Sequence, residues 1–372
     1  MRWRGTPAAR AVWVLLGAVV LWAALAAPVH AAFPGKNGKI AYVRDVCPDS
    51  GGCQGEQIWT MNPDGSDQTF LTAPGTEPAW SPDGSKIAFA AKRDTTHIVG
   101  YYDIFVMNAD GSDVRQLTND AAFDFSPNWS PDGTKIVFES NRDADLYSAQ
   151  YDVYVMNADG SDVKNLTRNP AFDGEPAWSP DGGRIAFISS RDPRLSTGLF
   201  LMDSDGTNVT LVTETGYANS HSPNWSPDGS KLVYTSGGYQ ISVVARDGTG
   251  NTLLSREDPS GFYHIESGPA WSPDGSRIVF MRFEGLGLDD EIFSIDPAGG
   301  DLTNLTSTSS DIDDYFPDWQ PIPGPRRSDF KNAAQFCKAE GDFLGESAFA
   351  QKYGANGNGS NAFGKCVSAN GG

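Results

Sequence analysis

The sequence predicts an all-β fold, a six-bladed β-propeller of four-stranded antiparallel blades. The first observation is that the segment PAWSPDGSKIAF at 78–89 recurs along the chain, with its tryptophans 46 to 49 residues apart at Trp80, Trp129, Trp178, Trp225, Trp271 and Trp319. The second is that each repeat holds four short strand-like runs separated by turns. A repeat of this length and content is typical of propeller blades, which bury their faces only against their neighbours.

The second repeat shows the expected blade. Strands are expected at 78–81, 86–90, 103–108 and 114–118, with Pro-Asp-Gly at 82–84 and Asp-Gly at 110–111 as turns. One tryptophan and one apolar pair per repeat are expected to fill the layers between blades, and the pairs are Ile87 and Phe89, Ile136 and Phe138, Ile185 and Phe187, Leu232 and Tyr234, and Ile278 and Phe280.

The two ends of the repeat region complement each other. The last copy, FPDW at 316–319, has no strands after it, and the first unit, from 38 to 72, lacks a first strand. We therefore expect 316–319 to pair with the strand at 39–43 and to close the ring, which leaves no open sheet edge between blades.

The repeat PxWSPDGxxIxF followed by YDIYVMNxDGSxxxxLT resembles the WD-like β-propeller repeat of TolB-type proteins, over about residues 35–322. The resemblance implies the fold, but such propellers serve as periplasmic protein-binding scaffolds, as gates of prolyl oligopeptidase-type peptidases and as oligogalacturonate lyases. The α/β domain that precedes the propeller in TolB has no counterpart in this sequence. Fold alone therefore does not assign an activity.

Three segments are expected. Residues 1–31 carry arginines, an apolar run and small residues before Ala31, which indicates a secretory signal peptide, with an uncleaved membrane anchor as the alternative. Residues 32–322 form the propeller. Residues 323–372 form a linker and a small tail of unknown function, with helices expected at 329–340 and 346–354. The protein is therefore expected to be secreted or to lie in the periplasm or cell envelope.

Four cysteines fit an exported chain. Cys47 and Cys53 flank a glycine-rich loop, and Cys337 and Cys366 lie in the tail. We expect one disulfide within each pair, because an even cysteine count outside the cytosol indicates disulfides and a residue spacing of six without nearby histidines fits zinc poorly.

The charge excludes some partners. Removing residues 1–31 leaves 25 basic and 47 acidic side chains, a net charge of −22, and there is no basic patch with interleaved aromatic residues. Nucleic acid is therefore not an expected partner, and neither is a membrane after signal cleavage. Many aspartates belong to Asp-Gly turns, and Arg142 is expected to pair with Asp152 across a hairpin.

Catalytic motifs are absent: the sequence has no GxSxG elbow, phosphate loop, dinucleotide fingerprint or zinc-protease motif. His221 and His264, with Glu266 or Asp313, could hold a divalent metal, which keeps a metal-dependent polysaccharide lyase of the oligogalacturonate type open as an alternative. The main expectation includes no metal, no cofactor and no enzyme activity.

Strand direction alternates within a blade, so the Asp-Gly turns are expected on one face of the ring and the variable loops on the other. We expect an exported, non-enzymatic, monomeric binding scaffold whose partner is a protein of the cell envelope or a small polar or cationic ligand. Recognition is assigned to loops at the channel mouth on the variable face. The candidate residues are Glu77, Asp124, Phe125, Asp173, Glu175, His221, Tyr263, His264, Asp313, Asp314 and Tyr315.

Overall fold

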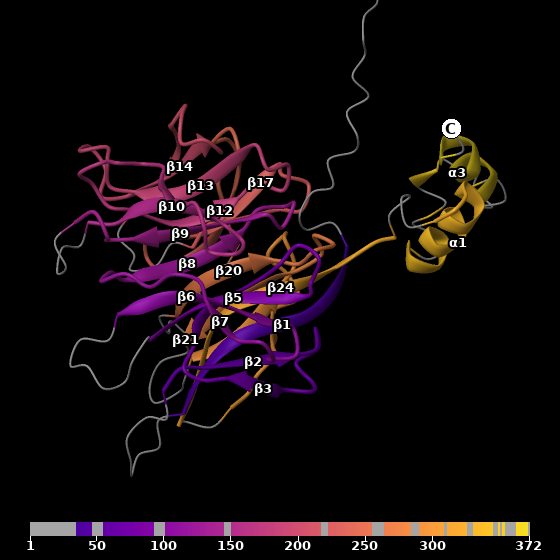
Figure 1. Ribbon diagram of the computed structural model, residues 1–372, viewed down its shortest axis with the longest axis horizontal. Helices are drawn as coiled ribbons and strands as arrows, with labels where there is room; N and C mark the ends of the chain where they lie inside the picture. The colour runs from indigo at the N-terminus through magenta and orange to yellow at the C-terminus, as the bar shows by residue number, and fades with distance from the viewer. Residues whose placement is uncertain are drawn as a thin grey trace, which may run out of the picture.

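A computed structural model shows six four-stranded antiparallel sheets arranged as a β-propeller, which confirms the expected fold class. The structure describes residues 35–46, 55–92, 101–144, 150–216, 222–254, 264–283, 290–308, 311–325, 330–344, 349, 352–353 and 362–370. Figure 1 shows the six blades as one body and the helical tail as a smaller one beside it.

Blade 1 is composite and closes the ring. Its strand order is β24 (Ile312–Pro323), β1 (Gly35–Val46), β2 (Gln57–Met61) and β3 (Thr69–Thr72). Trp319 lies opposite Ile40, and pairing continues to Gly35 opposite Pro323. The closure expected from the incomplete first and last repeats is therefore present, and it is longer than the four residues expected.

The other five blades each use four consecutive strands. Blade 2 holds β4 (Thr76–Trp80), β5 (Lys86–Lys92), β6 (Tyr102–Asn108) and β7 (Arg115–Gln116). Blade 3 holds β8 (Asp124–Trp129), β9 (Lys135–Ser140), β10 (Asp152–Asn157) and β11 (Lys164–Asn165). Blade 4 holds β12 (Asp173–Trp178), β13 (Arg184–Ser189), β14 (Gly198–Asp203) and β15 (Thr210–Glu214).

Blade 5 holds β16 (Asn224–Trp225), β17 (Lys231–Ser236), β18 (Gln240–Ala245) and β19 (Thr252–Leu253). Blade 6 holds β20 (Ile265–Trp271), β21 (Ile278–Phe283), β22 (Asp290–Ile295) and β23 (Thr303–Asn304). The first strand of each blade lines the channel and the fourth lies at the rim, so the blades present only short outer edges.

The core lies between blades. All six repeat tryptophans are buried, and the expected apolar pairs lie in the same layers. Neighbouring blades are also joined near the channel by polar contacts. The N–H of Trp178 donates to Asn128 Oδ1 over 2.9 Å, and the N–H of Trp80 donates to Asp318 Oδ2 over 2.8 Å. Packing explains the fixed place of the tryptophans.

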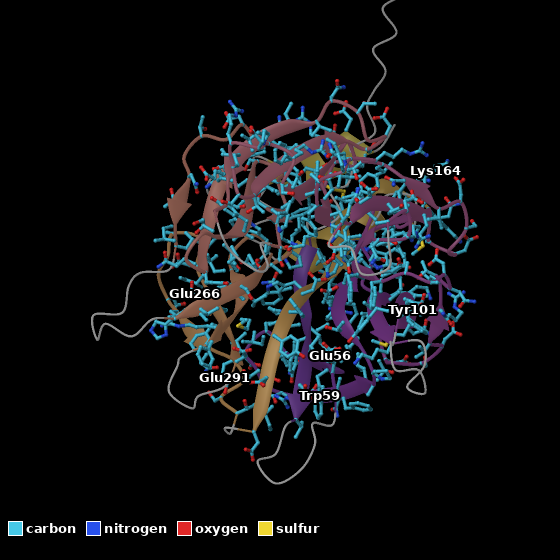
Figure 2. All side chains as sticks on the ribbon, turned by 90° about the vertical axis from the view of Figure 1, so that its left-hand side faces the viewer. Glu56, Trp59, Tyr101, Lys164, Glu266 and Glu291 are labelled. Carbon is cyan, nitrogen blue, oxygen red and sulfur yellow. A yellow bond between two sulfur atoms is a disulfide. The ribbon has the colours of Figure 1, made fainter. Side chains whose placement is uncertain are left out.

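The two ends of the ring differ, as alternating strand direction requires. The Asp-Gly turns lie at the end where β24 leaves towards the tail, which we call the turn face, and the other strand ends form the loop face (Figure 1). Figure 2 views the loop face, with Glu56 and Tyr101 on one part of it and Glu266 on another.

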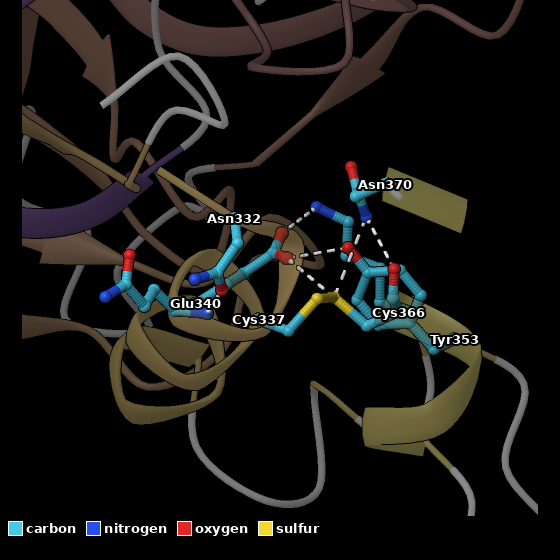
Figure 3. The surroundings of a disulfide bond; sticks show 8 residues. Asn332, Cys337, Glu340, Tyr353, Cys366 and Asn370 are labelled. Carbon is cyan, nitrogen blue, oxygen red and sulfur yellow. Dashed lines mark hydrogen bonds and ion pairs between the residues drawn. A yellow bond between two sulfur atoms is a disulfide. The ribbon is translucent and has the colours of Figure 1, made fainter. Parts of the chain in front are cut away.

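The tail holds two described helices, α1 (Ala333–Leu344) and α3 (Ala362–Asn370), joined by the expected Cys337–Cys366 disulfide. The buried Glu340 carboxylate accepts hydrogen bonds from Lys352 Nζ at 2.5 Å and from Tyr353 Oη at 2.6 Å (Figure 3). The glycine- and asparagine-rich composition of the last residues gave no sign of α3. Cys47 and Cys53 lie outside the described residues, as does most of the helix expected at 346–354.

Among the described residues, no helix has both the length and the apolar character needed to span a membrane.

Candidate binding site

The innermost strand of every blade has an irregular residue three positions before its tryptophan. This residue has a positive φ in all six blades, at Glu77 (51°), Ser126 (52°), Glu175 (51°), Ser222 (36°), Gly268 (61°) and Phe316 (51°). A proline follows each one. A non-glycine residue in this conformation costs about 1 kcal/mol or more, and five of the six residues are not glycine.

These six residues and the two that follow each of them line a cavity of about 120 Å³ in the channel. In five blades the register of the innermost strand shifts against the second strand, as between Phe125 and Asn128 in blade 3. Such bulges re-aim side chains and backbone groups away from the ladder. Here they direct polar groups towards the channel and the neighbouring blade.

Glutamates join three successive seams between blades. Glu77 Oε2 accepts the N–H of Ser126 across the seam of blades 2 and 3 at 2.6 Å. Glu139 Oε2 accepts the N–H of Glu175 across the next seam at 2.7 Å, and Glu175 in turn accepts the N–H of Ser222. The acceptors therefore satisfy backbone donors that the bulges remove from the sheets.

Burial makes two of these carboxyl groups hard to ionise. It raises the pKa of Glu77 to about 7, against the lowering effect of the Ser126 N–H, although part of the Glu77 side chain reaches the channel. The pKa of Glu139 lies well above its usual value because of burial and then because of Glu77 and Glu175. Binding of a proton or of a cation reduces the electrostatic repulsion within such a cluster of carboxyl groups.

Aromatic side chains surround these carboxylates on the loop face. The Tyr102 and Phe125 rings lie 4.6 Å apart, and Phe123 stacks on Phe125 at 6.4 Å. Tyr151 and Phe172 meet edge to face at 6.1 Å. All five are partly exposed, and Tyr102 Oη donates to Glu56 Oε2 over 3.2 Å. Partly exposed rings beside carboxylates are suited to binding cations.

Three of the expected mouth carboxylates have a different setting. Asp124, Asp173 and Asp314 lie inside strands rather than in loops, and none of the three is exposed to solvent. Their partners are arginines that lie in the second strand of the same blade or two residues after it. These are Arg142 at 2.9 Å, Arg191 at 2.6 Å and Arg44 at 2.7 Å, respectively. The negative charge of these three carboxylates is therefore compensated by arginines within the fold.

The expected pair of Arg142 with Asp152 is wrong. Arg142 turns back along β9 to Asp124 and also reaches Asp120 at 2.8 Å. Asp152 instead accepts hydrogen bonds from Thr167 Oγ1 and Asn165 Nδ2 of its own blade. The hairpin argument considered two neighbouring strands and left out the innermost one.

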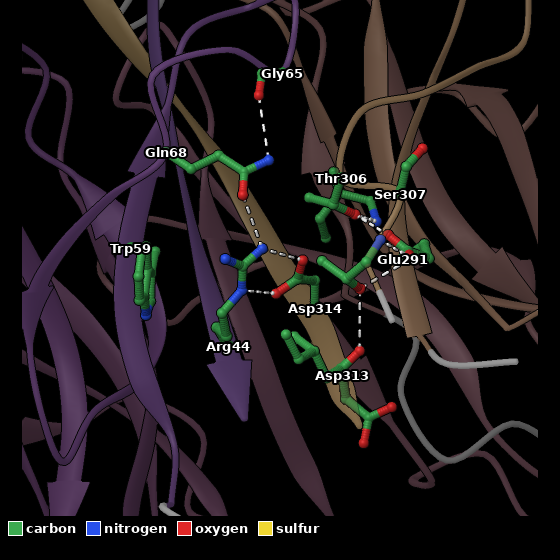
Figure 4. A network of polar contacts seen from close by, with 12 residues as sticks. Arg44, Trp59, Gly65, Gln68, Glu291, Thr306, Ser307, Asp313 and Asp314 are labelled. Atoms are coloured by element: carbon green, nitrogen blue, oxygen red, sulfur yellow. Dashed lines mark hydrogen bonds and ion pairs between the residues drawn. The ribbon is translucent and has the colours of Figure 1, made fainter. Parts of the chain in front are cut away.

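The remaining expected residues divide between the channel and its surroundings. Phe125 and Glu175 belong to the acidic and aromatic surface described above. Asp313 and Tyr315 are partly exposed on β24, and Figure 4 shows Asp313 next to Asp314 on this strand. Asp313 accepts the N–H of Asp290, and His264 is partly buried just before β20. His221 and Tyr263 lie outside the described residues.

Sequence reasoning missed six residues of this surface: Glu56, Tyr102, Phe123, Glu139, Tyr151 and Phe172. For Glu139 a signal was available, since the register-equivalent positions in the other blades hold Val43, Ala90, Ile188, Thr235 and Met281. A carboxylate at a position that is otherwise uncharged stands out once the repeats are aligned. Its direction towards the next blade could be seen only in the structure.

A metal centre has limited support among the described residues. Oxygens of Asp103, Asp120 and Asp124 lie within 4.8 Å of one another, a donor set suited to a hard cation. Arg142 already forms ion pairs with two of these carboxylates, so it supplies the positive charge at this place.

The turn face carries acid of another kind. Asp83 accepts hydrogen bonds from Ser81 Oγ at 2.7 Å and from the N–H of Ser85 at 3.0 Å, and equivalent turns recur around the ring. Partial burial opposes ionisation, yet these hydrogen bonds hold the pKa of Asp83 below its usual value. The carboxylates of these aspartates accept hydrogen bonds within their own turns.

The family model described as the TolB β-propeller domain matches residues 68–150 and 144–322. No curated protein matches the sequence. TolB from Acinetobacter baumannii is similar in structure, with a TM-score of 0.62 and 22% identity over 76% of this chain and 67% of that one. Hydrazine synthase of Kuenenia stuttgartiensis has a TM-score of 0.60 and 17% identity over 77% and 47% of the chains.

A putative TolB from Agrobacterium tumefaciens has a TM-score of 0.53 and 19% identity over 77% of this chain and 99% of that one. At these identities the structural likeness concerns the fold. The family model, in contrast, covers more than half of the sequence and matches the repeat that builds every blade. The chain belongs to the TolB β-propeller domain family.

Proposed function

We propose that this protein is an exported, non-enzymatic binding scaffold that recognises a protein of the cell envelope, or a small polar or cationic ligand, through the loop face of its channel. One observation carries the proposal. Carboxylates on the loop face lie beside partly exposed aromatic rings, as at Glu56 and Tyr102, whereas turn-face aspartates are engaged by their own turns. Rigid blades that present such a surface are suited to recognition.

Export and a non-enzymatic role rest on further support. The Cys337–Cys366 disulfide is consistent with an oxidising compartment, and the sequence of residues 1–31 with a signal peptide. The similar structures include TolB proteins. No catalytic motif occurs in the sequence.

Charge removal on each face tests the proposal. The loop-face variant carries Glu56→Gln, Glu77→Gln and Glu175→Gln. The matched turn-face variant carries Asp64→Asn, Asp110→Asn and Asp159→Asn, in which asparagine can keep the turn hydrogen bonds. Each purified chain is immobilised, and the partners it captures from an envelope extract are quantified. We expect the loop-face variant to lose capture and the turn-face variant to keep it, and equal capture would contradict the assignment.

A further inference from the structure

We propose that the loop face binds a basic segment of a partner protein, and that arginine or lysine side chains of this segment dock on one sector of the face rather than around the whole rim. The proposal deepens the function above and rests on it. The sector runs from the residue before β2 in blade 1 to blade 4, and is formed by Glu56, Tyr102, Phe125, Glu139, Phe172 and Glu175. We call it the acidic-aromatic sector.

The first half of the sector lies around blade 2. Glu56 holds Tyr102 through the 3.2 Å hydrogen bond to its hydroxyl, and Tyr102 packs against Phe125 of blade 3 at 4.6 Å between ring centroids. Glu77 Oε2 sits beside this pair, bonded to the N–H of the residue after Phe125. A carboxylate therefore lies on each side of a pair of rings.

The second half lies at the seam of blades 3 and 4 and adjoins the first. Glu139 is the register partner of Phe125, so the two seams meet at this point. A Cβ on Gly174 would meet both the Glu139 carboxylate and the edge of the Phe172 ring, which places carboxylate and ring side by side. Tyr151 extends the aromatic surface from Phe172. Five of the six residues are partly exposed and thus form one surface over the buried Glu139 carboxylate.

Blades 5 and 6 differ from blades 2 to 4 at the described positions that are equivalent to Glu77, Glu139 and Glu175. At the positions of Glu77 and Glu175, blades 5 and 6 carry Ser222 and Gly268, and at the position of Glu139 they carry Thr235 and Met281. At these three positions carboxylates therefore occur in blades 2 to 4 and not in blades 5 and 6. This asymmetry favours a ligand that engages the rim off the channel axis.

Basic side chains match this chemistry better than other ligands do. Arginine stacks its planar guanidinium on aromatic rings and bonds carboxylates with its edge, so a sector that alternates the two serves both functions. The sector already accepts a cation, since the Lys92 ammonium lies over the Tyr102 ring at 5.5 Å. The acidic chain, with 28 basic and 47 acidic side chains, also attracts a basic segment over longer range.

Proton release is a second signature of this binding mode. Glu139 faces Glu77 and Glu175, and these groups together with burial favour the protonated form of Glu139. Tyr151, the other titratable group coupled to Glu139, is itself held in its neutral form. Burial raises the pKa of the neighbouring Glu77 carboxyl to about 7. An arriving cation favours the ionised carboxylates, so binding should release protons and tighten between pH 6 and pH 8.

The test uses a fluorescent, acetylated and amidated peptide of four Arg-Gly repeats and its citrulline counterpart, which has nearly the same shape without charge. Binding to the full chain is measured by anisotropy at two salt concentrations and at pH 6 and 8. We expect the arginine peptide to bind at least about tenfold more tightly than the citrulline peptide, and less tightly in high salt.

Site variants locate the binding. We expect each of three sector variants to lower the affinity for the arginine peptide by about fivefold or more. The variants are Glu139→Gln, Phe125→Ala and Glu56→Gln. Two matched controls are expected to change this affinity by less than about twofold. They are Glu214→Gln, on the exposed outer strand of blade 4, and Phe70→Ala, on the rim of blade 1. Glu56→Gln changes a partly exposed residue, so it keeps the test valid if Glu139→Gln fails to fold.

The outcomes separate the two proposals. Equal affinity for the arginine and citrulline peptides overturns the inference of a basic segment. If the sector variants bind the arginine peptide as tightly as the unchanged protein does, the peptide does not bind at the acidic-aromatic sector. Either result leaves the scaffold function intact when the loop-face variant still loses partner capture. The opposite outcome is that both face variants capture partners equally while peptide binding still depends on the sector residues. This result would overturn the scaffold function and leave the peptide site supported.

Discussion

Arg44 and Asp314 are ion-paired through two hydrogen bonds, Nε to Oδ1 at 2.7 Å and Nη2 to Oδ2 at 2.7 Å, although 270 residues separate them in sequence (Figure 4). Arg44 belongs to β1 and Asp314 to β24, so the pair fastens the closing blade. The Arg44 guanidinium also lies over the Trp59 ring at 4.8 Å and donates to Gln68. Ring closure therefore depends on a buried charge pair as well as on strand pairing.

Removing one partner of this pair should weaken the whole ring. Asp314→Ala leaves the Arg44 guanidinium buried and uncompensated, and such changes cost about 3–5 kcal/mol. The exposed pair of Lys39 and Asp67 provides the control, because Lys39→Ala should cost less than about 1 kcal/mol. Urea unfolding of both variants measures the difference, and similar midpoints would show that the buried pair does not fasten the blade.

Truncation tests the closure itself. A chain that ends after Thr308 loses β24, opens blade 1 and exposes the edge of β1, so we expect aggregation on size-exclusion chromatography. A chain that ends after Pro325 removes only the tail and should keep the melting profile of the propeller. An unchanged melting profile of the shorter chain would contradict the closure model.

The tail and the propeller should respond differently to reduction. The Cys337–Cys366 bond joins α1 and α3 around a small cluster that includes Phe336 and Phe349. Replacing both cysteines by alanine should therefore reduce the helical signal of the tail while the propeller melts at its usual temperature. Peptide mapping without reductant also tests the predicted Cys47–Cys53 bond, and free thiols or crossed pairing would refute that prediction.

Stability should fall as the pH rises from about 5 to 8. Burial raises the pKa of Glu77 and of Asp318 to about 7, and that of Glu139 well above its usual value, so the folded state binds protons that the unfolded state has lost. Their stabilising contribution is complete below the unfolded pKa, near 4, and is lost as the pH rises through the folded pKa.

Thermal unfolding at pH 5.5 and 8.0 measures the effect, which we expect to be on the order of 1 kcal/mol after solvent screening. Glu139→Gln should reduce the difference because glutamine cannot ionise. Turn aspartates such as Asp83, whose pKa is lowered, contribute in the opposite sense at acid pH, so stability should fall again below about pH 4. A stability that is the same at both pH values would count against the buried carboxyl groups.

The sequence predicted the fold well because the evidence for it was repeated six times. Each tryptophan marks the same place in a blade, and the incomplete first and last repeats revealed the closure. The site was harder to predict because one residue in each innermost strand has a positive φ, which breaks the alternation used to assign faces. Asp124 therefore points to Arg142, and Glu139 to the backbone of the next blade.

Gly174 offers the sharpest test of how the site is built. Its φ is not positive, so its conformation alone does not require glycine, but an added Cβ would collide with the Glu139 carboxylate and with the Phe172 ring edge. Gly174→Ala should therefore displace Glu139 from the N–H of Glu175 and cost about 1–3 kcal/mol. Gly183→Ala, where a Cβ comes no closer than 3.4 Å to Asp181, should cost less than about 0.5 kcal/mol.

A double variant tests whether Gly174 is needed because it leaves space for the Glu139 carboxylate. Glu139→Ala removes the carboxylate that a Gly174 side chain would meet, so the cost of Gly174→Ala should shrink when both changes are present. Denaturant unfolding of the four chains gives the coupling, which we expect to be about 1 kcal/mol in favour of the double variant. Additive costs would show that the glycine serves another purpose and that the carboxylate reaches the seam without it.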